Sequence, residues 1–290
     1  MAFELFLVAA FGAMLAWGFG DFLIQRSVRK IGDLESLAFI GLIGFIGLTP
    51  FVLPDLPLLF LPQNLLLLAG LGALSFVVAM FNFEALKEGK LSVVDVVLEF
   101  ELPITIALGF FLFAESPSIF QFFLIIPIFA GIVLISMKKN FSFKKHHLLE
   151  KGVFYAIIAA IGLGLCNSFT AFSARSVSPL LAIWIPWGII FIVSMIFILK
   201  KHDVKKMFVN ASRFKWLILG MGIMDTLAWI FYSFSMAKIN VGIVTAITES
   251  YPVLGVILGV ALNREHITMY QILGAVLTIC ASIALAVTLL

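Results

Sequence analysis

Residues 92–113 read SVVDVVLEFELPITIALGFFLF, an apolar stretch that is long enough to cross a lipid bilayer yet carries several acidic residues. A related stretch occurs 150 residues later, where residues 242–263 read GIVTAITESYPVLGVILGVALN. At this offset Glu99 aligns with Glu249, and a proline follows each of these two acids closely. The chain therefore contains the same pattern of an acid followed by a proline twice.

The prolines of this pattern predict weak points in two spanning helices. Proline lacks a backbone N–H donor and clashes with the preceding helical turn, so we expect bends near Pro103 and Pro252. A charged side chain at the centre of a spanning helix costs about 2.5–3.5 kcal/mol on insertion scales. Glu99 and Glu249 are therefore expected to face the interior of a helix bundle or a wet cavity.

The composition is that of an integral membrane protein. Of 290 residues, 62% are hydrophobic and 12% are charged, against about 25% charged residues in soluble domains. The apolar segments are continuous, whereas a membrane β-barrel would show segments of about ten residues that alternate apolar and polar side chains. We predict an all-α fold with ten transmembrane helices, at residues 3–25, 34–53, 64–86, 92–113, 118–137, 152–174, 179–199, 215–237, 241–262 and 268–288.

Lys and Arg are distributed unevenly over the predicted loops. All but Arg175 and Lys238 of the 19 basic residues follow an odd-numbered span. Because cytoplasmic loops are enriched in Lys and Arg, this pattern predicts that both termini lie outside, in a protein of the plasma membrane. Nucleic-acid binding would also require basic residues, but these loops are short and flank apolar helices.

Internal similarity extends beyond the two acidic stretches. Glycine and polar positions match in order at the offset of 150: Gly70 with Gly220, Gly72 with Gly222, Glu115 with Glu265, and Gln121 with Gln271. We therefore predict two repeats, 1–137 and 152–290, joined by a basic linker at 138–151. Five helices per repeat is an odd number, so the second repeat must be inverted relative to the first. Inverted repeats are typical of transporters with a substrate site at the repeat interface, although a duplication can also be kept only for packing.

In their order and spacing these residues resemble the drug/metabolite transporter superfamily, specifically its EamA-type members with ten helices. The resemblance covers both halves and includes Trp17-Gly18, Ala85-Leu86, Pro103, Pro252, and the matched Glu and Gln positions given above. The second half departs from the pattern, with Cys166-Asn167 in place of Trp-Gly. The resemblance implies two inverted five-helix repeats around a central cavity, peripheral fifth and tenth helices, and an exporter or exchanger of small metabolites. Family members are often drawn with cytoplasmic termini, which disagrees with the loop charges here.

The candidate residues for binding substrate or protons are acids within the predicted spans: Asp21, Glu99, Glu101, Asp225 and Glu249. Glu99 is the first choice because it has a repeat partner and lies near the centre of its span. Asp95 shares a helical face with Glu99, whereas Glu101 points in a different direction along a continuous helix. Clustered buried acids can take up and release protons, so proton coupling is feasible. The alternative for each acid is a protonated side chain bonded to nearby backbone.

Polar and aromatic residues of the spans are expected to line the cavity: Trp17, Asn82, Asn167, Trp229 and Tyr232. The last two share a helical face with Asp225, and aromatic rings can stack on a cationic ligand. No Lys or Arg lies deep in a predicted span. The interior therefore suits an ammonium group better than a phosphorylated sugar or nucleotide, for which Arg is the usual ligand. We predict secondary-active transport of a small amine-bearing metabolite, such as an amino acid, with a lipophilic cation as the alternative cargo.

A function of another class has weaker support. Residues 18–21 read GFGD, which matches the GxGD signature of intramembrane aspartyl proteases. In such enzymes the second aspartate normally follows Tyr, whereas here Asp95 follows Val94 and Asp225 follows Met224. The His and Cys spacings predict no metal site, and no phosphate loop or nucleophile motif predicts a cofactor or an enzyme. The expected partners are the lipid bilayer, a small-molecule substrate and, as an open alternative, protons, without nucleic acid.

Overall fold

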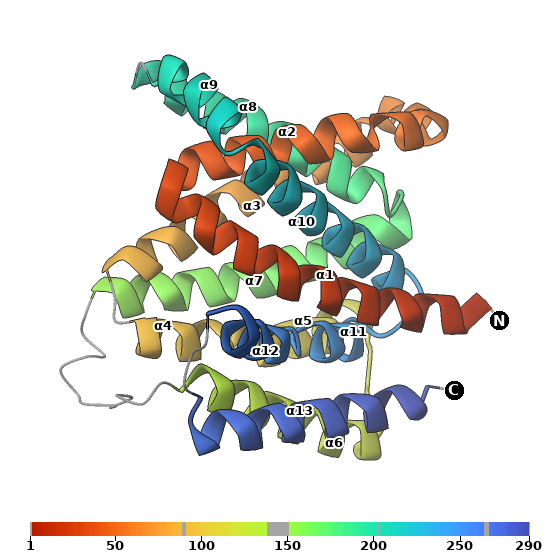
Figure 1. Ribbon diagram of the computed structural model, residues 1–290. Coiled ribbons are helices and arrows are strands. Elements are labelled where there is room, and N and C mark those ends of the chain that lie inside the picture. The colour runs from red at the N-terminus through yellow and green to blue at the C-terminus, as the bar shows by residue number, and fades with distance from the viewer. Residues whose placement is uncertain (1, 89–90, 138–150, 202, 264–266, 290) are drawn as a thin grey trace.

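The structure is a computed structural model that describes residues 2–88, 91–137, 151–201, 203–263 and 267–289. Within these ranges, ten helical segments are long and apolar enough to cross a membrane. The ten spans predicted from the sequence are thus confirmed. The spans lie in layers, and both ends of the chain lie at one end of the bundle (Figure 1).

The first half of the chain forms five of these spans. They comprise α1 (Ala2–Ile31), α2 (Asp33–Val52), α3 (Pro62–Glu88), the pair α4 (Leu91–Leu98) and α5 (Glu101–Phe113), and α6 (Ile119–Ser136). A short 3₁₀ helix, η1 (Leu53–Phe60), continues directly from α2. Pro54 and Pro57 lie in this segment and cannot donate the hydrogen bonds of a regular α-helix, so the α-helix ends here.

The second half repeats this arrangement. It comprises α7 (Lys151–Ser176), α8 (Leu181–Lys200), α10 (Lys215–Met236), the pair α11 (Val241–Thr248) and α12 (Pro252–Asn263), and α13 (Met269–Val287). An additional helix, α9 (Val204–Arg213), lies between the seventh and eighth spans and was missed by the sequence analysis. It is amphipathic and basic, and it lies at the end of the bundle away from the chain termini (Figure 1). These properties suit a helix at the surface of a membrane.

The fourth and ninth spans differ from prediction because neither is one continuous helix. The backbone turns at residues 99–100 between α4 and α5, and at residues 249–251 between α11 and α12. Pro252 is the first residue of α12, where a missing N–H removes no helical hydrogen bond, and Pro103 lies in the first turn of α5. Both breaks therefore fall just before the proline of each repeat.

Helices of one repeat pack against helices of the other repeat in the pattern that is expected of two inverted repeats. α1 packs along α10 of the other half, and α7, which is the repeat partner of α1, packs along α3, the repeat partner of α10. α2 packs against α8, α5 against α11, and α6 against α13, each with its own repeat partner. A two-fold axis in the membrane plane would produce these pairings, so the structure agrees with the predicted inverted repeats.

The helices α6 and α13 approach each other at two glycines. A Cβ atom built on Gly131 would lie 2.7 Å from the carbonyl oxygen of Gly274, and one built on Gly274 would lie 2.6 Å from that of Gly131. Both distances are too short for any side chain. The two helices therefore cross with their backbones in contact, as small residues allow in membrane bundles.

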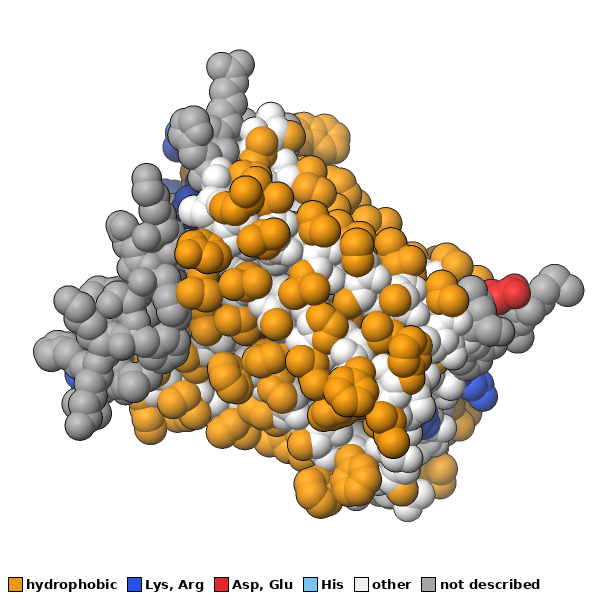
Figure 2. Space-filling model, turned by 90° about the horizontal axis from the view of Figure 1, so that it is seen from below, with side chains coloured by type: hydrophobic (Ala, Val, Ile, Leu, Met, Phe, Trp, Pro, Cys, Tyr) orange, Lys and Arg blue, Asp and Glu red, His pale blue; other side chains and the backbone are white. Residues whose placement is uncertain are grey.

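The outer surface is apolar, as contact with lipid requires. The face seen in Figure 2 is covered by hydrophobic side chains, with few charges. Phe111 of α5 and Ile119 of α6 are each 79% exposed, although a soluble protein would bury most such side chains. An exposed apolar surface of this extent marks an interaction site, and here the partner is the bilayer.

Candidate functional site

The two interrupted spans bring Glu101 and Glu249 together. Glu101 is the first residue of α5, and Glu249 is the residue that ends α11. Both side chains are buried, and their carboxyl groups lie within hydrogen-bonding reach of each other. A hydrogen bond between two carboxyl groups requires a proton on one of them, because an ionised carboxylate only accepts. The contact between the halves is thus a site that can hold a proton.

Asn167 of α7 supports this carboxyl pair. Its Nδ2 donates to Thr105 Oγ1 on α5 over 3.2 Å, and the side chain also lies within hydrogen-bonding reach of Glu101. One turn earlier on α7, a Cβ atom at Gly164 would lie 2.6 Å from Ile104 Cγ2. The glycine therefore lets α5 and α7 approach closely enough for Asn167 to orient the carboxyl group of Glu101.

A second pair of acids lies where α1 packs against α10. Asp21 lies near the Tyr251 hydroxyl, and Asp225 lies near the Trp17 indole. Asp225 is buried, and its Oδ2 has no hydrogen-bond partner among the described residues. A buried carboxyl oxygen without a partner costs free energy. It therefore marks a place where a proton or a cationic group would be stabilised.

Aromatic side chains surround both pairs of acids. The Trp17 ring centroid lies 5.3 Å from that of Trp229, 5.1 Å from that of Tyr232 and 6.4 Å from that of Tyr251. Tyr232 is fully buried, and its hydroxyl forms a 2.6 Å hydrogen bond with Thr245 Oγ1 on α11. The acids thus lie within an aromatic group that could contact a cation through ring faces.

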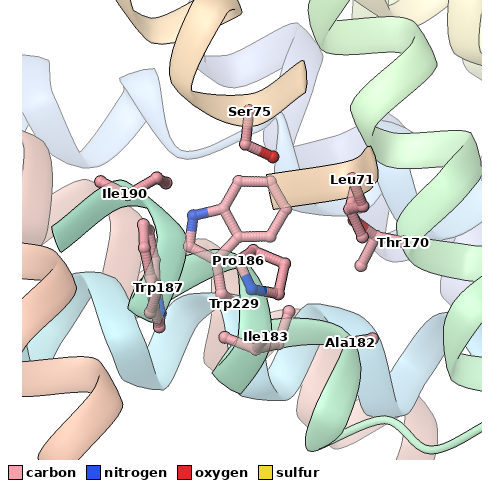
Figure 3. A pocket seen from close by; sticks show the side chains of 9 residues that line it. All are labelled: Leu71, Ser75, Thr170, Ala182, Ile183, Pro186, Trp187, Ile190 and Trp229. Atoms are coloured by element: carbon pink, nitrogen blue, oxygen red, sulfur yellow. The ribbon is translucent and has the colours of Figure 1, made fainter. Parts of the chain in front are cut away.

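A small cavity adjoins this aromatic group. It has a volume of about 40 Å³ and is formed by α3, α7, α8 and α10. Figure 3 shows the Trp229 indole in its middle, with Ser75 and Thr170 as polar lining residues and Trp187 along one side. The volume suits water rather than a metabolite. Trp229 lines this cavity and also contacts Trp17, the ring that lies beside Asp225.

The remaining predicted residues have other described contacts. Glu99 Oε1 accepts a 3.0 Å hydrogen bond from Ser136 Oγ on the peripheral helix α6, and the Glu99 carboxyl group also lies near enough to Glu249 to interact with it electrostatically. Asn82 lies on α3, and its Oδ1 is buried without a hydrogen-bond partner within the described ranges. The side chain of Asp95 lies outside what the structure describes.

The comparison with known proteins fits this arrangement. Residues 5–137 and 150–287 both match the EamA-like transporter family. The chain belongs to this family. An EamA-like protein is a membrane transporter and not an enzyme, so the aspartyl protease alternative is set aside. The acids of this EamA-like chain are therefore candidates for residues that act in transport.

Solved structures agree on the fold of this EamA-like protein. One of them, described only as "Crystal structure of protein", has a TM-score of 0.80 and 18% sequence identity, and the match covers 98% of this chain and 96% of that chain. At this identity the likeness shows the fold alone. No curated protein matches the sequence at a significant level.

Sequence reasoning missed three polar residues near the acids of this EamA-like chain. Thr105 is hydrogen-bonded to Asn167 and Thr245 to Tyr232, whereas Tyr251 interacts with Asp21 itself. Tyr251 carried a usable signal, because at the offset of 150 it aligns with Glu101. An acid in one repeat and a tyrosine at the aligned position of the other are both polar, so the alignment of the repeats marks this position as polar in both halves.

Proposed function

We propose that this EamA-family protein is a secondary-active transporter that exports or exchanges a small amine-bearing metabolite, such as an amino acid, by alternating access. The observation that carries the proposal is the buried contact between Glu101 and Glu249, which come from opposite halves of the molecule. A ligand bound at this contact would touch both repeats. Its binding would therefore respond to any movement of one half against the other.

The chemistry of the neighbouring residues favours a cationic group on the substrate. Asp21 and Asp225 lie on two further helices, and the surrounding rings can stack on a cation. Neither acid pair is neutralised by a Lys or Arg among its described contacts, so an ammonium group could take that role. A lipophilic cation would satisfy the same groups and remains the second candidate cargo.

Proton exchange follows from the same contact. A carboxyl pair that shares a proton binds an ammonium group more strongly after that proton has left, because the charge of the pair then becomes more negative. Substrate and proton would therefore compete for Glu101 and Glu249. Such competition is the basis of exchange, in which the amine moves one way and protons move the other way.

The same proposal includes the placement of the chain. Two repeats at residues 1–137 and 152–290, joined by a basic linker at 138–151, would lie in the cell membrane. The basic residues of the odd-numbered loops would face the cytoplasm and both termini would lie outside. Three of these basic residues, Lys205, Lys206 and Arg213, lie together on the helix α9.

Flux into proteoliposomes tests the proposal. Purified protein would be offered radiolabelled amino acids, organic cations and nucleotide sugars, with a pH-sensitive dye in the vesicle lumen. We expect uptake of an amine or organic cation with opposed proton movement, and loss of both signals in the double variant E101Q/E249Q. Uptake of phosphorylated sugars or nucleotide sugars alone would overturn the proposed substrate class.

A further inference from the structure

An ion pair joins the two halves at the end of the bundle that holds the chain termini. Arg175 lies in the last turn of α7, and Glu115 lies just after α5. Arg175 Nη2 lies 2.6 Å from Glu115 Oε1, and the two side chains are only 26% and 13% exposed. A short, largely buried pair of this kind is stronger than an exposed one.

Both charged groups are also bonded to backbone of the second half. Arg175 Nε donates to the carbonyl oxygen of Met236 and Arg175 Nη2 to that of Ile239, each over 2.8 Å. Glu115 Oε2 accepts from the backbone N–H of Val241, the first residue of α11, over 2.7 Å. This set of contacts, which we name the terminal latch, thus connects α5 with α7, α10 and α11.

The backbone around Glu115 positions its carboxylate for these bonds. Ala114 adopts a left-handed conformation with φ of 53°, and the N–H of Glu115 then donates to the carbonyl oxygen of Gly109. A Cβ atom at Gly109 would lie only 3.4 Å from Glu115 Oε2, so the glycine leaves space for the carboxylate. The ring of Phe113 packs against the guanidinium of Arg175 at 4.8 Å. The latch is therefore a built site and not a chance surface contact.

The latch lies between the chain-terminal end of the bundle and the carboxyl pair. Along α7, Asn167 precedes Arg175 by eight residues, which corresponds to about 12 Å of helix. Along α5, Glu101 and Thr105 lie further inside than Glu115. Both helices therefore run from the latch to the acids, and α11 does the same from Val241 to Glu249.

A second bond between the halves closes the same end. Ser178, which follows α7, donates its hydroxyl to Asp55 of η1. The backbone N–H groups of Leu180 and Leu181 donate to the same serine oxygen. The turn between α7 and α8 is thus attached to the first half through Ser178, whose oxygen also holds the start of α8.

We propose that the terminal latch is the gate that closes the carboxyl pair to the terminal side and that it breaks once in every transport cycle. This inference rests on the proposed alternating access, because only then must that side open. Breaking the latch leaves Arg175 and Glu115 to be hydrated, which is possible at the membrane edge. The closed state is therefore held by bonds that can be exchanged for water.

Accessibility of a cysteine placed behind the latch tests the gate without any substrate. Thr105→Cys would be made in a chain whose Cys166 and Cys280 are replaced, and it would be labelled by an impermeant maleimide from the terminal side. Removal of one charged hydrogen-bond partner costs about 1.5–3 kcal/mol, so E115Q or R175Q should raise labelling about 10- to 100-fold. Thr245→Cys serves as a second reporter if Thr105→Cys does not fold.

The matched control removes a charge at the opposite end. Lys206 Nζ lies 3.9 Å from Glu35 Oε1 and is largely exposed. K206Q should leave labelling of Thr105→Cys unchanged. Equal labelling in the parent, E115Q and R175Q chains would overturn the gate, as would an equal increase in K206Q.

Cross-linking then tests whether opening is required for flux. E115C/R175C would be joined by a short cleavable bismaleimide, and flux should be lost on cross-linking and return on cleavage. The control is S27C/S36C, whose native hydroxyl oxygens lie 3.2 Å apart within the first half, and whose cross-link should leave flux intact. Full flux through a completely cross-linked latch would contradict the inference. If no amine is transported but labelling still rises in E115Q, the result supports the terminal latch as a gate and contradicts the proposed substrate class.

Discussion

The two interrupted spans are copies of one repeat, yet their acids contact different parts of the molecule. In the second copy Glu249 turns inward and meets Glu101. In the first copy the aligned Glu99 accepts a hydrogen bond from Ser136 of α6, and the acid that pairs with Glu249 is Glu101, two residues later. An inverted repeat has thus kept its backbone break while the position of its central acid has moved.

What the copies share is the attachment of each break to a peripheral helix. Glu99 is bonded to Ser136 of α6, and Ser250 forms a 2.7 Å hydrogen bond with Ser282 of α13. They differ in burial, because every residue of α11 is buried, whereas Phe100 at the first break is 49% exposed. The second copy is therefore the more buried one, with Glu249 and Ser250 at its break both buried.

The largest expected effect separates Glu249 from its aligned residue Glu99. E249Q removes both the shared proton and a charge that could bind an ammonium group, so flux should fall about 10- to 100-fold, as expected for the loss of a charged hydrogen bond of about 1.5–3 kcal/mol. In the parent protein, flux should fall as the pH on the loading side falls, because protons then occupy the pair. This dependence should be absent in E249Q.

E99Q is the matched control in the same flux assay. Because Glu99 is hydrogen-bonded to Ser136 and reaches Glu249 only through its charge, E99Q should keep flux within about threefold of the parent, which corresponds to less than 1 kcal/mol. Equal losses of flux in E99Q and E249Q would contradict this prediction. The acids needed for transport would then be those that align between the repeats, and not those of the contact between Glu101 and Glu249.

A smaller effect is expected from the prolines. Pro252 begins α12 directly after a three-residue turn, so P252A restores an N–H that could join α11 to α12 as one helix. We expect flux to fall about fivefold, equivalent to about 1 kcal/mol. At the first break the backbone N–H groups of Leu102 and Ile104 already donate to the carbonyl oxygens of Glu99 and Phe100, so P103A should change flux less. A larger loss of flux in P103A than in P252A would contradict this prediction and would mean that the break in the first repeat matters more for transport.

The smallest effect concerns the serines that hold the breaks. S136A removes a bond to a group that can be charged, worth about 1.5–3 kcal/mol, whereas S282A removes a bond between hydroxyls, worth about 0.5–1.5 kcal/mol. Thermal unfolding in detergent should therefore show the greater loss of stability for S136A. A greater loss for S282A would mean that enclosure within the protein matters more than charge at these breaks.

The sequence was sufficient for the fold class and the number of spans. Spanning helices must satisfy their backbone internally and face lipid, so composition and length alone reveal them. Inversion followed from counting five helices per repeat, and the helix pairings agree with it. These properties depend on many residues at once, which makes them robust to the identity of any single one.

Local geometry could not be predicted in the same way. The directions of Glu99 and Glu101 were assigned by rotating 100° per residue, but the helix ends between them and the rotation no longer applies. The helix α9 was missed because it is short and polar. Arg175 was noted only as an exception to the loop charges, since its partner Glu115 lies 60 residues earlier and only folding brings them together.

The crossing of α6 and α13 limits how the two halves can move. At Gly131 and Gly274 the backbones touch, so sliding one helix along the other would drive a bulkier neighbour onto a carbonyl group. Rotation about the crossing avoids this clash and keeps the contact. If the halves move against each other, this helix pair would suit a pivot, and small angular changes there would become larger displacements at the opposite edge of the bundle.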